Sequence, residues 1–193
     1  GDLCSDFGGN VKFLIGPKKK YKKININNNI IFYTKYGESS PSYRVRFLPF
    51  QKILEDNNFR VLKKELFNKK FYINKIFKNK LKLYDILYFY LLRLIDILFR
   101  SKPFIAIIHI ELLPYIPFLG EFILKIRKIP YVIDFDDAVY YRFENKNKFL
   151  FYIDKLKFNY MASNSNSILA GNDFHINYFK TLNNNIRYFP TTI

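Results

Sequence analysis

From Ile30 onward, short apolar runs alternate with longer stretches of helical periodicity, and this alternation constrains the fold more than any other feature. Continuous apolar runs of this length are typical of strands buried on both faces. A repeated strand–helix order favours a parallel sheet covered by helices on both sides. We therefore expect an α/β fold, a Rossmann-like doubly wound parallel sheet. The expected strands are 30–34, 59–64, 103–110, 130–135, 167–171 and 186–190; the expected helices are 41–57, a long region ending near 100, 114–128, 149–162 and 172–182.

Two helix starts carry clear local signals. Ser40 is expected as an N-cap with Pro41 at the first helical position, and Pro49 is expected to kink or restart that helix. Asn172 is expected to cap the helix that follows it.

The most apolar stretch, 83–99, is interrupted by Asp85, Arg93 and Asp96. It falls short of the roughly 18 uncharged residues expected of a membrane-spanning helix. We interpret it as an amphipathic helix buried against the sheet. The alternative is a helix lying on a bilayer, which the Tyr and Phe residues at its edges would suit.

The length of 193 residues fits one domain with a sizeable core, and the 49% apolar and 20% aromatic content excludes wholesale disorder. Residues 1–28, with a lysine run and an asparagine-rich stretch, read as a terminal segment or linker of unknown role, and 29–193 as the folded domain. The start lacks the pattern of a signal peptide and an initiator Met, which indicates a fragment of a longer protein.

The charge is strongly basic, with 32 Lys and Arg against 16 Asp and Glu, or +16 overall. Such a field favours anionic partners: phosphates, nucleic acid or an acidic membrane surface. The alternative is that most of these charges only solvate the surface. The single cysteine, Cys4, excludes an internal disulfide, and the two histidines, His109 and His175, form no zinc-ligand pattern. A reducing, cytoplasmic setting and no metal are therefore expected.

Doubly wound sheets bind ligands at the carboxyl ends of their strands, so the loops there are the places to seek function. The first such loop, 34–46, has no dinucleotide or P-loop glycine pattern. Gly37 allows close backbone approach, while Ser39 and Ser40 lie at a helix N-terminus with free N–H groups. Arg44 and Arg46 could add a fork to a phosphate or a sugar hydroxyl. The alternative is an ordinary turn with surface arginines.

Two later strand ends carry acids. His109, within an apolar run, is more typical of a core residue, whereas Glu111 could bind sugar hydroxyls, hold a neighbouring base or cap a helix. Alternation places Asp134 and Asp136 on one side of their strand and Asp137 on the other. Close carboxylates can act as a general base, as hydroxyl acceptors or as metal ligands. The alternative is that Asp137 caps a helix and Asp134 pairs with a buried Lys or Arg.

These motifs, in order, resemble the N-terminal half of GT-B glycosyltransferases of the family-four type: YTKYGESSPSYRVRFLPF, HIELLPYIPF, YVIDFDDAVY, ILAGNDFHINYF and IRYFPTTI, over residues 30–193. The resemblance implies two Rossmann-like domains, the N-terminal one binding the acceptor and the C-terminal one a nucleotide-sugar. It implies a hexosyltransferase that retains anomeric configuration and needs no metal or other cofactor. The acceptor would be a cell-surface or lipid-linked glycan.

By motif, Gly37, Ser39 and Ser40 correspond to the loop that approaches the donor diphosphate, and Arg44 and Arg46 follow it. Glu111 corresponds to the acceptor side. Asp136 and Asp137, the expected catalytic pair, lie at the strand end where many relatives carry a His. The sequence departs from the family in lacking paired glycines in the first loop and in lacking the second domain with its spaced glutamates. The chain alone is therefore expected to be inactive.

The expected function is that of a glycosyltransferase fragment, cytoplasmic and peripheral at the inner face of the membrane. The alternative is a non-enzymatic basic module that binds nucleic acid or an anionic membrane. Nucleic acid is the less expected partner, because most aromatic residues fall in expected strands and buried helix faces rather than beside lysines on one surface.

Overall fold

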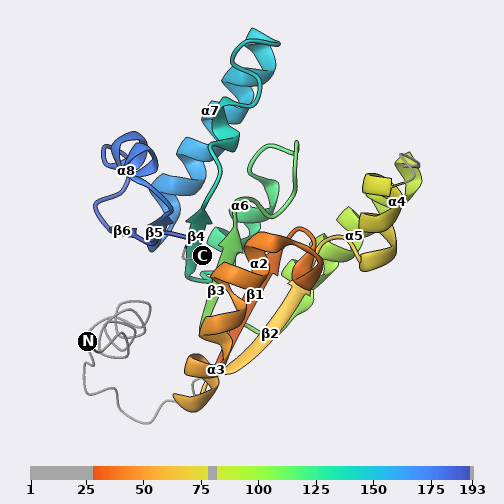
Figure 1. The fold of residues 1–193 in the computed structure, drawn as a ribbon, viewed down its shortest axis with the longest axis vertical. Coiled ribbons are helices and arrows are strands. Elements are labelled where there is room, and N and C mark those ends of the chain that lie inside the picture. The colour runs from red at the N-terminus through yellow and green to blue at the C-terminus, as the bar shows by residue number, and fades with distance from the viewer. Residues whose placement is uncertain (1–27, 78–81, 192–193) are drawn as a thin grey trace.

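The computed structural model describes residues 28–77 and 82–191, so nearly all of the expected terminal segment 1–28 lies outside the described residues. Six strands form one parallel sheet in the order β2-β1-β3-β4-β5-β6 (Figure 1). This confirms the expected α/β, Rossmann-like doubly wound fold. The strands are β1 (Asn29–Thr34), β2 (Arg60–Glu65), β3 (Ile105–His109), β4 (Tyr131–Phe135), β5 (Ser167–Ala170) and β6 (Ile186–Tyr188).

The helices follow the expected alternation. They are η1 (Gly37–Ser39), α2 (Pro41–Arg46), α3 (Leu48–Asp56), α4 (Lys69–Phe77), α5 (Leu83–Phe99), α6 (Leu119–Ile126), η2 (Val139–Tyr141), α7 (Lys148–Asn164) and α8 (Asp173–Phe179), where η marks a short 3₁₀ helix. The restart at Pro49 is confirmed, because α2 ends at Arg46 and α3 begins at Leu48. The cap is confirmed too, since the Asn172 side chain accepts a hydrogen bond from the His175 N–H.

One expected helix was too long. The sequence pattern predicts a helix over 114–128, but α6 begins only at Leu119. Pro114 and Pro117 precede it, and proline lacks the N–H that a continuing helix would donate. The segment between β3 and α6 is consequently a loop, and it stays at the carboxyl end of the sheet, where it can contribute to a site.

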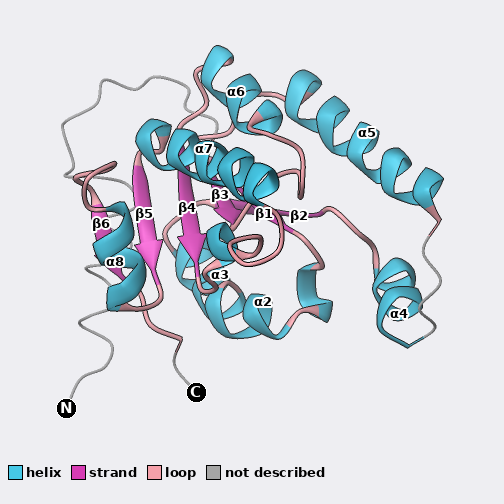
Figure 2. Ribbon diagram, turned by 90° about the horizontal axis from the view of Figure 1, so that it is seen from above, coloured by secondary structure: helices cyan, strands magenta, loops and turns pink. Residues whose placement is uncertain are grey.

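Helices cover the sheet on both sides, as Figure 2 shows, with α2 and α3 on one face and α5, α6 and α7 on the other. Alternate residues of β1 enter the two cores: Ile30 and Phe32 pack on the α2–α3 side, and Ile31 and Tyr33 on the α5–α7 side. Each fully buried large apolar side chain contributes about 1.5–3 kcal/mol. The inner strands β1, β3, β4 and β5 are therefore held by burial on both faces, whereas the edge strands β2 and β6 are partly exposed.

The strand order changes direction at β1. The chain passes from β1 to β2 on one side and returns to β3 on the other, so β1 and β3 are neighbours with their connections leading in opposite directions. Open α/β sheets bind ligands outside the carboxyl ends of the strands at such a switch point. The topology thus indicates that a ligand would bind at the ends of β1 and β3, beside Thr34 and His109.

Two charged residues of α5, Arg93 and Asp96, point inward, toward the sheet. Arg93 is buried, lies over the Tyr33 ring and donates to the Thr34 and Lys64 carbonyls at 3.3 and 3.0 Å. Asp96 accepts a 3.1 Å hydrogen bond from the Tyr33 hydroxyl and lies 3.4 Å from Lys64 Nζ. The expectation that this helix packs against the sheet is confirmed, and two of the charges that interrupt its sequence, Arg93 and Asp96, contact the sheet.

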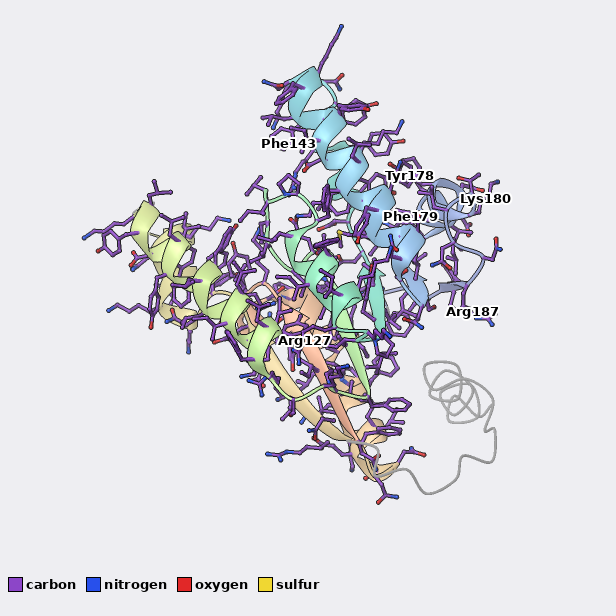
Figure 3. All side chains as sticks on the ribbon, turned by 180° about the vertical axis from the view of Figure 1, so that it is seen from behind. Arg127, Phe143, Tyr178, Phe179, Lys180 and Arg187 are labelled. Carbon is purple, nitrogen blue, oxygen red and sulfur yellow. The ribbon has the colours of Figure 1, made fainter. Side chains whose placement is uncertain are left out.

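The outer face of α5 is apolar and exposed. Its large exposed side chains are Leu83, Tyr84, Leu87, Tyr88, Leu91, Leu92, Ile95, Leu98 and Phe99. We call this set the α5 outer face. Figure 3 views this side of the molecule, and the labelled Arg127 ties α6 to the end of α5 by donating to the Ile97 and Arg100 carbonyls. Within the parts of the chain that the structure covers, every helix is too short or too polar to cross a bilayer.

Candidate functional site

A cavity of about 300 Å³ opens at the β1–β3 switch point. We call it the switch-point cavity. Its polar lining comes from three strand ends. The β1 end and the loop after it contribute Thr34, Lys35, Ser40 and Ser42; the β3 end contributes His109, Glu111 and Tyr115; the β4 end contributes Asp137 and Arg142. The volume and the convergence of polar groups are typical of a small-molecule site.

His109 forms one wall of this cavity together with its partner Asp136. Its Nε2 atom lies 3.2 Å from Asp136 Oδ1, and its ring packs edge-on against Phe47 at a centroid distance of 5.5 Å. Burial disfavours the imidazolium, but the Asp136 carboxylate outweighs this and raises the pKa of His109. Burial likewise opposes ionisation of Asp136, yet His109 and the Ser42 hydroxyl hold the pKa of that carboxyl well below its usual range. The pair therefore favours a cationic imidazole at the cavity wall.

Glu111, which also lines the cavity, joins a buried ion network. Its carboxylate accepts from Arg142 Nη1 at 2.9 Å and from Lys157 Nζ at 2.6 Å, and Arg142 also binds Asp154. Burial opposes the charge on Glu111, but Lys157 and Arg142 lower its pKa. Glu111 does not cap the next helix, because α6 begins at Leu119 and its N-cap residue is Phe118, with no side-chain cap hydrogen bond. Glu111 thus positions Arg142 at the cavity.

The backbone that carries Glu111 has an unusual conformation. Ile110 has φ of 66°, in the left-handed region that β-branched residues rarely adopt, and Tyr115 in the same loop has φ of 62°. Such conformations cost about 1–3 kcal/mol each and cluster at functional sites. Both residues line the switch-point cavity. The free-energy cost of these two conformations is consistent with a loop whose conformation serves ligand binding.

Lys35 adds a further cation at the cavity mouth. Its ammonium lies 5.5 Å from the ring centre of Tyr36 and 6.0 Å from that of Tyr115. Burial and the nearby positive charges of Lys75, Arg142 and Lys157 lower the pKa of Lys35 to about 8, although Glu111 acts in the opposite direction. The cavity therefore has an excess of positive charge at this side.

Of the residues expected from the sequence, Ser40, Glu111 and Asp137 line the cavity directly. Asp136 acts on it through His109. Both acids follow the end of β4 at Phe135, and their surroundings differ, since Asp136 contacts His109 and Asp137 lines the cavity. Asp137 is exposed, and Asp136 is largely covered.

Arg46 lies outside the switch-point cavity lining. It is 2% exposed, and its Nε donates to Asp134 Oδ2 at 2.9 Å. Its Nη1 donates to the Phe189 carbonyl at 2.8 Å and to Thr191 Oγ1 at 3.0 Å. The guanidinium is committed to internal partners, so the fork expected for a phosphate is not presented to the cavity. The alternative, that Asp134 pairs with a buried Arg, is confirmed.

The rest of the first loop has structural roles in this geometry. Gly37 has φ of +52°, a conformation that favours glycine, and a Cβ atom there would also meet the end of the exposed Glu65 side chain, which would have to shift. Arg44 is exposed and donates to the Glu38 carbonyl at 3.0 Å. Gly37, Ser39 and Arg44 do not line the cavity.

Sequence reasoning missed Lys35, Ser42, Tyr115 and Arg142 and placed His109 in the core. His109 is indeed 8% exposed, but it also lines the cavity. Lys35 directly follows a strand, so the strand-end rule could have found it. Arg142 follows η2 and is brought to the site by its ion network, for which no local sequence signal exists.

Neither the known protein families nor the curated proteins include a match to this chain. Across residues 28–77 and 82–191, no three His, Cys, Asp or Glu side chains gather in a way that could hold a metal ion. The fold and the site themselves define a Rossmann-like α/β protein with a polar, cation-rich cavity at its switch point.

Proposed function

We propose that the chain is the acceptor-side half of a GT-B glycosyltransferase, which with its donor-side half transfers a sugar from a nucleotide-sugar to a cell-surface or lipid-linked glycan. The observation that supports this most is the switch-point cavity, in which Ser40, His109, Glu111 and Asp137 meet from three strand ends. The parallel sheet and the order of motifs along the chain agree with it.

The residues suit the chemistry of such a transfer. Asp137, exposed at the cavity, can accept a hydrogen bond from the attacking hydroxyl and take its proton. His109 can donate to a sugar or phosphate oxygen, and Asp136 favours its protonated form by raising its pKa. Departure of a diphosphate needs donors aimed at the developing negative charge, and the Lys35 ammonium at the cavity could supply one. The N–H groups of Ser39 and Ser40, expected to be free, instead donate to the Tyr36 and Gly37 carbonyls. No metal or other cofactor is part of the proposal.

A peripheral contact with an anionic membrane belongs to the same proposal. The α5 outer face exposes nine large apolar side chains, and the one basic residue of α5, Arg93, is buried beneath it. A surface that binds nucleic acid would instead intersperse its aromatics with lysines. Of the two forms of the basic-module alternative, the apolar α5 outer face favours membrane binding.

The test is turnover of nucleotide-sugars by the full-length product of the gene, with lipid-linked and soluble glycans as acceptors. We expect Asp137→Asn to lower transfer by two to four orders of magnitude, in the range of a lost general base, about 10²–10⁴-fold. Asp56→Asn, at an exposed position at the end of α3, serves as a matched control and should retain activity. Absence of turnover with every nucleotide-sugar, or full activity of Asp137→Asn, would contradict the proposal.

A further inference from the structure

A second cavity of about 200 Å³ adjoins the switch-point cavity and shares Lys35, Tyr36 and Tyr115 with it. We call it the α4–α5 cavity, because α4 contributes Phe71 and Lys75, and α5 contributes Ile86 and Tyr90. Figure 1 shows these two helices together at one side of the sheet. The two cavities are thus neighbours with a shared wall.

The two cavities differ in chemistry. The switch-point cavity is lined by hydroxyls, carboxylates and His109. The α4–α5 cavity is lined by apolar and aromatic side chains, among them Phe67, Phe71 and Ile86. Phe67 and Phe71 stack with their ring centres 4.2 Å apart, which gives this cavity a firm apolar wall. A ligand that fills both must be polar at one end and apolar at the other.

Two lysines lie where the cavities meet. Lys75 Nζ donates to the Tyr36 hydroxyl at 2.7 Å, and Lys35 lies over the Tyr36 and Tyr115 rings. Over the ranges that the structure covers, neither lysine forms an ion pair with a carboxylate. The acid closest to hand in the cavity, Glu111, is already bound by Arg142 and Lys157. Two ammonium groups therefore lack a counter-charge at this junction.

We propose that the region binds an amphiphile, with its polar head in the switch-point cavity, a phosphate-type anion on Lys35 and Lys75, and the start of its apolar chain in the α4–α5 cavity. This rests on the proposed function and deepens it, because it selects a lipid-phosphate acceptor over a soluble glycan. The α5 outer face begins on the same helix that supplies Ile86 and Tyr90, so an apolar chain leaving this cavity would continue toward a bilayer.

The lowered pKa of Lys35, about 8, agrees with this arrangement. The groups that act on Lys35 are the ammonium groups of Lys75 and Lys157, the Arg142 guanidinium and the Glu111 carboxylate. A bound phosphate would add negative charge beside the ammonium and favour its protonated form. Ligand binding should consequently take up protons near pH 8.

The experiment is calorimetric titration of the 193-residue chain with three probes: octyl phosphate below its micelle concentration, inorganic phosphate and octyl glucoside. We expect octyl phosphate to bind at least tenfold more tightly than either of the other two, because only it fills both subsites. Equal affinity for octyl phosphate and inorganic phosphate would overturn the apolar subsite, and equal affinity for octyl phosphate and octyl glucoside would overturn the anion subsite.

Variants separate the two subsites. Lys35→Gln should weaken octyl phosphate about tenfold and leave octyl glucoside unchanged. Ile86→Asn should weaken octyl phosphate and leave inorganic phosphate unchanged. Lys155→Gln, which removes one charge from an exposed position on α7, is the matched control and should bind all three probes normally. If Lys155→Gln lost as much affinity for octyl phosphate as Lys35→Gln, general surface charge would explain the effect and the proposal would be overturned. A thermal melt of each variant checks that it is folded.

The two proposals can fail separately. Octyl phosphate binding needs no sugar transfer, so the expected pattern of affinities together with no nucleotide-sugar turnover would reject the glycosyltransferase and keep the amphiphile site. Turnover on soluble glycans with no preference for octyl phosphate would keep the glycosyltransferase and reject the amphiphile site.

Discussion

The imidazole of His109, at the end of β3, lies 3.2 Å from the carboxylate of Asp136, which follows β4. The two strands are neighbours in the sheet, with His109 in register with Asp134, so the pairing of parallel strands brings a base and an acid from separate segments to one cavity wall. The relationship gives the cavity wall a titratable imidazole whose pKa is raised mainly by Asp136.

Asp136→Asn should lower the pKa of His109, because burial is then opposed only by the more weakly acting Asp134 carboxylate. An NMR titration of the imidazole protons measures this directly, and His109→Gln assigns the signal, since the chain has two histidines. Asp137→Asn is the control and should leave the pKa of His109 close to that of the unchanged chain. A normal titration in Asp136→Asn would show that the pair is not coupled.

The same pair should shape stability against pH. His109 has a raised pKa, so its contribution is complete below 6.5 and is lost as pH rises through the raised value. Asp136 has a lowered pKa, so its contribution is present above 3.8 and is lost as pH falls through the lowered value. Urea unfolding as a function of pH should show that the pair increases the free energy of unfolding between pH 3.8 and pH 6.5. This increase should be absent in His109→Gln.

Arg46→Met should destabilise the fold by about 3–5 kcal/mol, because it leaves the Asp134 carboxylate buried without its partner. Arg46→Met combined with Asp134→Leu should recover much of that loss, since a buried pair can be replaced by apolar groups at little cost. Arg44→Gln, exposed on the same helix, is the control and should stay within about 0.5 kcal/mol. Urea unfolding measures all three. A loss for the double variant as large as for the single one would count against the explanation.

Gly37→Ala should destabilise by about 1–2 kcal/mol from the left-handed backbone alone, with a further loss from the contact with Glu65. Adding Glu65→Ala should remove only the second part, because the backbone cost remains. Thermal unfolding of the single and double variants separates the two contributions. Full recovery in the double variant would mean that φ at position 37 carries no cost.

Leu87→Glu and Leu91→Glu should each weaken binding to anionic vesicles several-fold without lowering the melting temperature, since both side chains are exposed on the α5 outer face. Val45→Glu, on α2 at the other side of the sheet, makes the same change in charge and is the matched control. Vesicle co-sedimentation at low salt measures the binding. If Val45→Glu weakens it equally, net charge rather than the α5 outer face drives the contact.

Local sequence patterns predicted much of this fold because their causes are local. The short apolar run before Thr34 is stable only when it is buried, as it is in β1. Pro49 cannot continue a helix, so one helix ends before it and another begins there. The expected helix over 114–128 failed at its start, since its apolar periodicity continued across two prolines that break helical hydrogen bonding. The candidate site was predicted in part, through the strand-end residues Ser40, Glu111 and Asp137.

The sequence by itself determined the order of the strands and the helical segments between them, because burial and backbone hydrogen bonding act over a few residues at a time. Tertiary structure alone decided which of the polar residues meet. Arg46 and Asp134 stand 88 positions apart, and Lys157 reaches Glu111 across 46. Such partners follow from strand order and helix placement. This is why Arg46 is internal, while His109 and Lys35 belong to the cavity.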